Sequence, residues 1–75
     1  MAIIKNSSEL GETLQTRRKE LGLTQAHAAS LAGVSTRLWS ECETGRREGV
    51  SLDVVIRMLQ IVGLDLTVSP RGARP

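Results

Sequence analysis

Residues 25–44, QAHAASLAGVSTRLWSECET, contain two short apolar patterns separated by a glycine, and this spacing decides the fold. Ala29 lies one turn into the first pattern, Gly33 follows its end, and Trp39 returns to the same face in the second. Two helices that cross at close range need a small side chain where they touch, and Ala29 supplies one. A glycine tolerates the positive φ angle of a tight turn. The stretch therefore predicts a helix-turn-helix with a core of Ala29, Gly33, Val34, Trp39 and Cys42.

Capping residues and glycines divide most of the chain into four predicted helices. Ser, Thr and Asn side chains accept hydrogen bonds from the first free N–H groups of a helix, and glycine commonly follows a helix end. Such residues stand at both ends of each apolar pattern. They predict a first helix that begins after a cap within residues 6–8 and runs to residue 21, followed by helices over residues 25–32, 36–44 and 52–62.

The fourth predicted helix and the segment after it are too apolar for one small chain. The helix sequence LDVVIRMLQIV spreads its apolar residues well beyond the stripe that packing on one neighbour needs. Residues 64–69 then alternate with a period of two, as in a half-buried strand, until Pro70. A lone strand needs a pairing partner, either Ile3 and Ile4 or a second subunit. The pattern predicts a dimer interface formed by Val54, Met58, Ile61, Leu64, Leu66 and Val68.

The outer face of the third predicted helix carries residues suited to reading base edges. In a helix-turn-helix, the second helix of the motif lies in the major groove. Arg37 can contact guanine O6 and N7, or instead a phosphate, or pair with Glu41 four residues on. Glu41 can accept from cytosine N4 or orient Arg37, and orientation is favoured because a carboxylate near phosphates is costly. Leu38 can meet a thymine methyl group or a second subunit. The predicted base-contact residues are Thr36, Arg37, Leu38, Ser40 and Glu41.

Basic clusters flank the motif on both sides, although the net charge is only +2. One cluster precedes the second helix and one follows the third. Helix N-termini add unpaired N–H groups and a positive dipole, which suit phosphate oxygens. The predicted phosphate contacts are Arg17, Thr24, Gln25, Thr44, Arg46 and Arg47.

Length and composition predict a single intracellular domain without catalytic chemistry. Seventy-five residues make one domain, expected to have its core at residues 8–69 and a frayed tail at residues 70–75. The single cysteine, Cys42, excludes an intrachain disulfide and fits a reducing cytoplasm, and no signal or membrane-spanning segment is apparent. His27 stands among alanines without a nucleophile nearby, so we expect no enzyme, no metal and no cofactor.

Three short motifs resemble the lambda-repressor/Cro (Xre) group of helix-turn-helix proteins. They are LTQ at residues 23–25, AGVS at residues 32–35 and E-x-G at residues 43–45, within a match covering residues 10–62. The resemblance implies an inner ion pair between Arg18 and Glu43. The predicted fold is thus an all-α, four-helix lambda-repressor-like domain with a short C-terminal strand, working as a dimer.

The later segments, VSTRLWSE and SLDVVIRMLQIVGLDLTV, resemble HipB-like antitoxins. This resemblance implies a homodimer that binds a palindromic operator in double-stranded DNA, represses its own operon and binds a HipA-like kinase toxin. A stand-alone phage-type repressor, a restriction-system controller and a protein-interaction module without DNA binding remain alternatives.

Overall fold

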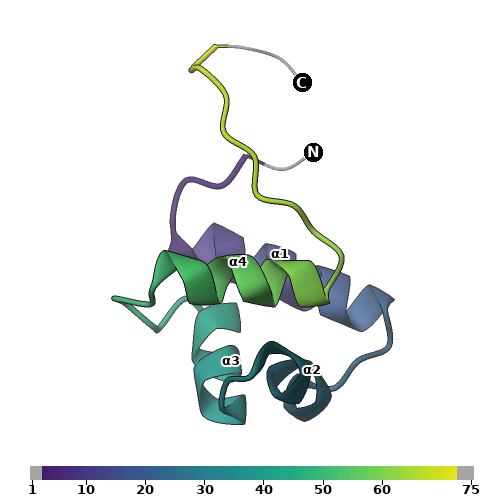
Figure 1. The fold of residues 1–75 in the computed structure, drawn as a ribbon. Helices are drawn as coiled ribbons and strands as arrows, with labels where there is room; N and C mark the ends of the chain where they lie inside the picture. Colours follow the sequence, from purple (N-terminus) through teal and green to yellow (C-terminus); the bar gives the residue numbers. More distant parts are fainter. Residues whose placement is uncertain (1–2, 73–75) are drawn as a thin grey trace.

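A computed structural model describes residues 3–72 of the chain and contains four helices. They are α1 (Ser7–Glu20), α2 (Gln25–Ala32), α3 (Thr36–Glu43) and α4 (Leu52–Ile61) (Figure 1). The all-helical prediction is therefore confirmed, and α2 has the limits predicted for it. The other three helices each end one residue before the predicted position.

Each helix begins at the kind of cap that the sequence indicated. Side-chain oxygens of Asn6, Thr24, Ser35 and Ser51 each accept a hydrogen bond from the main-chain N–H three residues further on. Each bond satisfies one of the N–H groups that have no partner within the helix. Four local caps therefore fix where the helices start, independently of the core.

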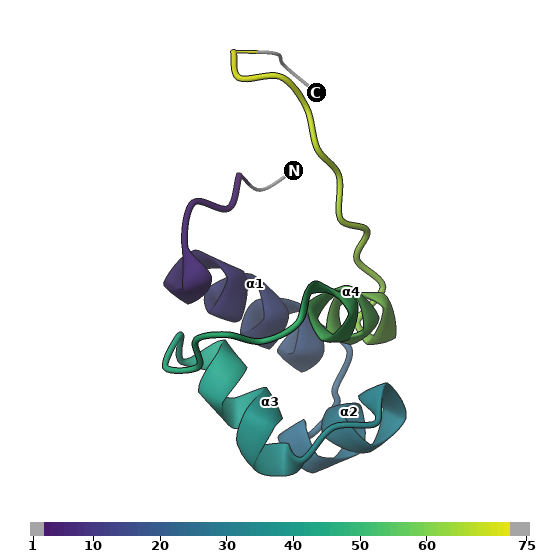
Figure 2. The same cartoon turned by 60° about the vertical axis from the view of Figure 1, so that its left-hand side comes forward.

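The helices form two layers, and both chain ends leave from the same layer. Figures 1 and 2 show α1 and α4 on one side of the molecule, with α2 and α3 on the other. In both views, the described parts of the terminal segments extend from the α1 and α4 side, away from α2 and α3. The helix-turn-helix therefore occupies one end of the molecule, and the chain termini occupy the other.

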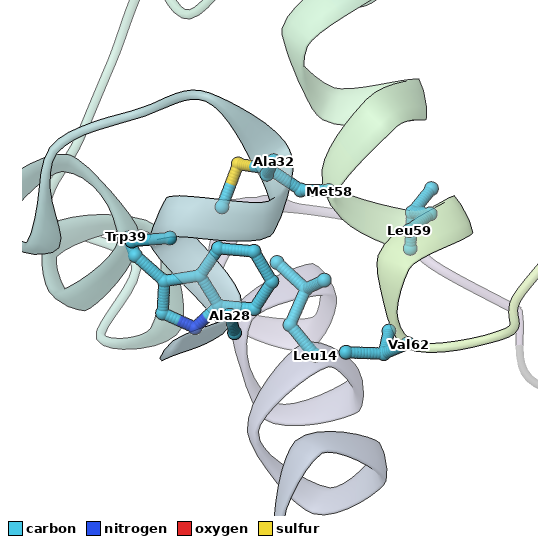
Figure 3. Packing of buried hydrophobic residues seen from close by; sticks show 8 residues of the cluster. Leu14, Ala28, Ala32, Trp39, Met58, Leu59 and Val62 are labelled. Carbon is cyan, nitrogen blue, oxygen red and sulfur yellow. The ribbon is translucent and has the colours of Figure 1, made fainter. Parts of the chain in front are cut away.

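The indole of Trp39 is the one large aromatic ring in the core, because the chain contains no Phe or Tyr. Trp39, Met58 and Val62 are fully buried, and Leu14 is nearly so (Figure 3). The small side chains of Ala28, Ala29 and Ala32 are buried in the same cluster. Large and small residues complement each other here, and interiors pack densely only when they do.

The buried position of Met58 corrects its predicted place in a dimer interface. Its side chain is completely inaccessible within one chain, so it cannot contact a second subunit. Val54, Ile61 and Leu64 are half-buried and pack against the core, whereas Leu66 remains exposed. The error arose because apolar residues surround much of α4. The sequence pattern alone did not show which of them face the core and which face outward.

The C-terminal strand predicted at residues 64–69 is absent from the described part of the chain. The Leu64 N–H donates to the Leu59 carbonyl oxygen at 2.9 Å and closes the end of α4. Residues 65–70 follow as an irregular segment, and Ile3 and Ile4 form no ladder with it. A strand exists only as part of a hydrogen-bonded pair, and residues 3–72 of a single copy supply no second strand. The predicted tail is described only to Gly72, and its last three residues lie outside the described range.

Candidate nucleic-acid interface

The turn between α2 and α3 holds the two helices in a fixed relation. Gly33 adopts a φ of 72°, in the left-handed region that favours glycine. The N–H of Val34 then donates to the Ala29 carbonyl oxygen at 3.0 Å, and the Ser35 hydroxyl oxygen caps α3. Ala29 itself is buried in the core cluster, together with Trp39 of α3. The sequence-predicted core thus lies where the two helices meet, with Val34 and Cys42 half-buried at its edge.

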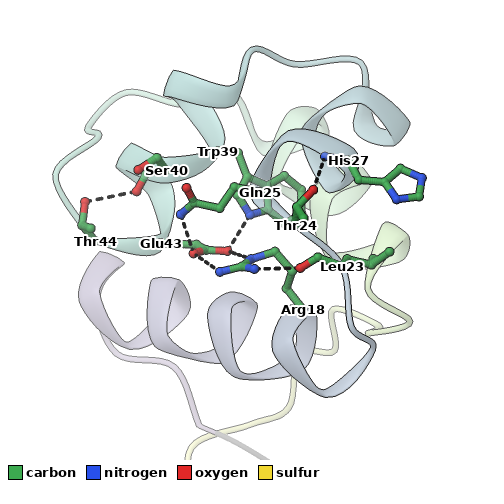
Figure 4. Close-up of polar contacts among 9 residues, drawn as sticks. All are labelled: Arg18, Leu23, Thr24, Gln25, His27, Trp39, Ser40, Glu43 and Thr44. Carbon is green, nitrogen blue, oxygen red and sulfur yellow. Dashed lines mark hydrogen bonds and ion pairs between the residues drawn. The ribbon is translucent and has the colours of Figure 1, made fainter.

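A buried carboxylate on the inner side of α3 ties together three helices. The Glu43 side chain is fully inaccessible, and both its oxygens accept hydrogen bonds (Figure 4). Arg18 of α1 donates from Nε at 2.5 Å and from Nη2 at 3.1 Å. Trp39 donates from Nε1 at 2.6 Å, and Gln25 at the start of α2 donates from Nε2 at 2.9 Å. The pair of Arg18 and Glu43 expected from the family resemblance is therefore present, within a larger network.

The network stabilises both charges of the ion pair. Burial by itself raises the pKa of Glu43, but the hydrogen bonds from Arg18, Gln25 and Trp39 outweigh it and hold that pKa below its usual range. The hydrogen bond to Glu43 raises the pKa of Arg18, and desolvation only partly opposes this. Arg18 also donates from Nη1 to the Leu23 carbonyl oxygen at 2.8 Å. Among the described residues, every buried side-chain nitrogen and oxygen atom has a partner.

The outer side of α3 presents polar side chains to solvent. At about 100° per residue, Thr36, Arg37, Ser40 and Glu41 fall within one arc of the helix, beside the side that carries the buried Trp39 and Glu43. The Arg37 side chain is 87% exposed. Leu38 is half-buried and lies at the edge of this arc, beside the inner face. The structure thus brings four of the five predicted base-contact residues onto one accessible surface and places Leu38 at its border.

Glu41 makes several contacts on this surface. Its Oε2 lies 3.5 Å from Arg37 Nε, and its Oε1 accepts a hydrogen bond of 3.2 Å from Arg47 Nη1. Its main-chain carbonyl oxygen accepts from the N–H groups of Arg46, at 2.9 Å, and Arg47, at 3.3 Å. The segment that follows α3 is thereby folded back onto the outer side of that helix.

The predicted phosphate contacts fall into different environments. Thr24 is exposed and caps α2, and the Thr44 hydroxyl donates to the Ser40 carbonyl oxygen at 3.2 Å. Arg46 is exposed, and its side chain forms no hydrogen bond or ion pair with the described residues. The side-chain amide nitrogen of Gln25 donates to Glu43, and this group therefore also contributes to the buried network. These residues lie around α3, and their phosphate contacts stay predictions.

Arg17 is engaged in contacts within the chain, and its predicted phosphate contact stays a prediction. Its Nε donates to the Val62 carbonyl oxygen at 2.9 Å, and its Nη1 lies 3.6 Å from the Glu20 carboxylate. The side chain therefore caps the C-terminal end of α4, on the layer that faces away from the motif. Three consecutive basic residues suggested one cluster. Neighbouring positions on a helix point about 100° apart, however, so these residues do not face the same way.

Sequence reasoning missed the role of Gly11. We interpreted glycines as punctuation between helices, yet Gly11 lies inside α1 and is buried. A Cβ atom at this position would collide with the carbonyl oxygens of Cys42 and Glu43 at the end of α3. A glycine within a predicted helix costs about 1 kcal/mol relative to alanine, and that unexplained cost was the signal of a close approach.

The fold and the site define a helix-turn-helix protein in which a buried network orients the second helix of the motif. A family model described as "Helix-turn-helix domain" matches residues 9–70, so the chain belongs to this family. The chain is also similar to the solved structure of the clp gene regulator ClgR from C. glutamicum, at 30% identity and a TM-score of 0.74, with 80% of this chain and 76% of that one covered. No curated protein matches the chain significantly. Within the described residues, no helix is long and apolar enough to span a membrane.

Proposed function

We propose that this chain is a sequence-specific DNA-binding transcriptional repressor that acts in the cytoplasm as a homodimer. The observation that carries the proposal is the two-sided character of α3. Its inner side is anchored by Glu43, and its outer side presents an 87% exposed Arg37 with neighbouring hydroxyl groups. A rigidly held helix with free polar side chains is what base readout in the major groove requires. Membership of the helix-turn-helix family and the likeness to a gene regulator support it.

Dimerisation completes the proposal for DNA recognition. Leu52 on α4 is 64% exposed, Leu66 is 49% exposed and Val68 is 93% exposed, which leaves apolar surface for a partner. A second copy offers an identical segment at residues 64–69, so two such segments can pair as strands across a two-fold axis. The two α3 helices then read the halves of a palindrome about one helical turn apart.

We further propose that the repressor is the antitoxin of a type II toxin-antitoxin pair. The support is the sequence resemblance of residues 34–41 and 51–68 to HipB-like proteins. In that role, the chain represses its own operon and binds a HipA-like kinase toxin. The competing regulators, a phage-type repressor or a restriction-system controller, use the same DNA surface and differ by having no kinase partner.

Binding of the purified chain to DNA tests the main proposal. We expect tighter binding to duplex from its own upstream region than to random duplex at about 150 mM salt, where non-specific binding is weak. The matched variants are Arg37→Ala and Arg57→Ala. Arg57 donates to the Ala32 carbonyl oxygen at the end of α2, away from the exposed side of α3, so its loss should leave the preference unchanged.

Equal affinity of the wild-type chain for both duplexes contradicts recognition of a DNA sequence and favours the alternative of a protein-interaction module without DNA binding. The antitoxin role has a separate test, co-purification of the chain with the product of the neighbouring reading frame. A kinase-like product that binds supports the antitoxin, whereas a specific DNA-binding chain without such a partner supports a stand-alone regulator.

A further inference from the structure

The exposed side of α3 contains an arginine-glutamate-arginine bridge formed by Arg37, Glu41 and Arg47. One oxygen of the Glu41 carboxylate faces each arginine, at 3.5 Å from Arg37 Nε and 3.2 Å from Arg47 Nη1. The three side chains differ in exposure, because Glu41 is 27% exposed, Arg47 is 48% exposed and Arg37 is 87% exposed. Glu41, in the middle of the bridge, is therefore its least exposed member, whereas Arg47 is half-exposed and Arg37 is largely exposed.

The atom through which Arg37 meets the bridge matters for recognition. The closest contact is through Nε, the nitrogen at the base of the guanidinium fork. The two terminal nitrogens donate no hydrogen bond to the described residues, and these are the atoms that contact guanine O6 and N7. Glu41 can therefore restrain Arg37 without occupying the terminal nitrogens that would contact a base.

Arg47 is fixed to the same glutamate through both its side chain and its main chain. Its N–H donates to the Glu41 carbonyl oxygen at 3.3 Å, while its Nη1 donates to the carboxylate. Arg46, its neighbour, shares the main-chain attachment at 2.9 Å but leaves its side chain without a partner among the described residues. The two consecutive arginines thus differ in one respect, namely the contact with the Glu41 carboxylate.

We infer that Glu41 and Arg47 are positioning residues that hold Arg37 toward one base pair, so that Arg47 contributes to sequence selectivity and not only to uniform attraction for phosphate. The inference rests on the proposed DNA-binding function. Without Arg47, the Glu41 carboxylate loses its second partner and becomes free to change rotamer. Without Glu41, Arg37 can turn from the base edge to the nearest phosphate, which removes its discrimination between sequences.

The experiment first selects preferred duplexes from a random library with the wild-type chain and then measures affinities for every single-base variant. Arg37→Ala identifies the base pair that Arg37 reads, by a loss of discrimination of about tenfold or more there. We expect Glu41→Gln and Arg47→Ala to lower discrimination at that same base pair by about threefold, as suits a surface ion pair. The control Arg46→Ala should weaken binding to all sequences alike.

Three outcomes separate the inference from the proposed function. If Arg47→Ala weakens all sequences equally, as Arg46→Ala does, the inference is overturned while DNA recognition stands. If Glu41→Gln changes the preference at a different base pair, Glu41 contacts a base directly, and the inference is again wrong. If the wild-type chain selects no sequence, the proposed function itself fails. Trp39 fluorescence on unfolding checks that each exposed-site variant keeps its fold, because that indole is fully buried.

Discussion

Replacement of Arg18 by methionine tests the inner network, because it leaves the buried Glu43 carboxylate without its cation. The substitution keeps much of the aliphatic volume but removes the two hydrogen bonds and the charge that Arg18 gives to Glu43. Breaking a buried pair by removing one partner typically costs about 3–5 kcal/mol. Since Trp39 and Gln25 still donate to Glu43, we expect the lower end of that range, about 3 kcal/mol.

That loss is large for a small domain, in which the whole free energy of unfolding is on the order of 5 kcal/mol. The assay is urea unfolding at pH 7, followed by the emission of Trp39, the only aromatic side chain. The matched control is Arg17→Met, which removes an adjacent arginine that is partly exposed and caps α4. We expect the control to cost about 1 kcal/mol, the usual net value of one hydrogen bond.

The pH dependence of the free energy of unfolding provides a second test of this prediction. In the wild-type chain the pKa of Glu43 is lowered on folding, so its contribution to stability is complete above its unfolded pKa, about 4.3, and is lost as the pH falls through the folded value. Without Arg18, Glu43 loses the hydrogen bonds and the charge that lower its pKa most, so less of the variant's stability depends on ionisation of that carboxyl group. The difference between wild type and Arg18→Met should therefore shrink as the pH falls below about 4, where the wild-type contribution is lost. A variant within 0.5 kcal/mol of wild type at pH 7, on the order of a neutral surface change, would refute the reasoning.

Three further substitutions test other parts of the structure. Gly11→Ala should destabilise the chain by more than about 2 kcal/mol in urea unfolding, although alanine is the better helix former, and a gain in stability would contradict the close approach to α3. Trp39→Phe should cost about 2 kcal/mol, in urea unfolding followed by circular dichroism, by removing the indole donor to Glu43 and some buried area, and an undiminished stability would show that this bond contributes nothing. Leu66→Asp should lower the dimer fraction in analytical ultracentrifugation without lowering monomer helicity by circular dichroism, and an unchanged dimer would exclude residues 64–69 from the interface.

The helices could be predicted from sequence because their limits depend on local chemistry. Asn6, Thr24, Ser35 and Ser51 each cap a helix through a neighbour three residues away, so no knowledge of the rest of the fold is needed. The motif core was predictable for a similar reason, since the spacing from Ala29 to Trp39 follows from helix geometry and one turn.

The errors arose where long-range contacts decide the outcome. Met58 belongs to a pattern that suggested an outward role, yet its side chain is buried within the chain, which only the packing of α4 reveals. The strand at residues 64–69 depends on a partner that one chain does not provide. Gly11 faces α3 across more than thirty residues of sequence, and a glycine inside a predicted helix signals a close approach without showing which element approaches.

The central claim is that the outer side of α3 contacts DNA, and amide chemical-shift mapping tests it most directly. Isotope-labelled chain is titrated with its selected duplex, and shift changes are followed for every backbone amide. We predict the largest changes at Thr36, Arg37, Ser40 and Glu41 and at the start of α2, with small changes along the exposed side of α4. Changes that concentrate on α4 and residues 64–69 while α3 stays unperturbed would contradict the claim and move the DNA-binding surface to the other end of the molecule.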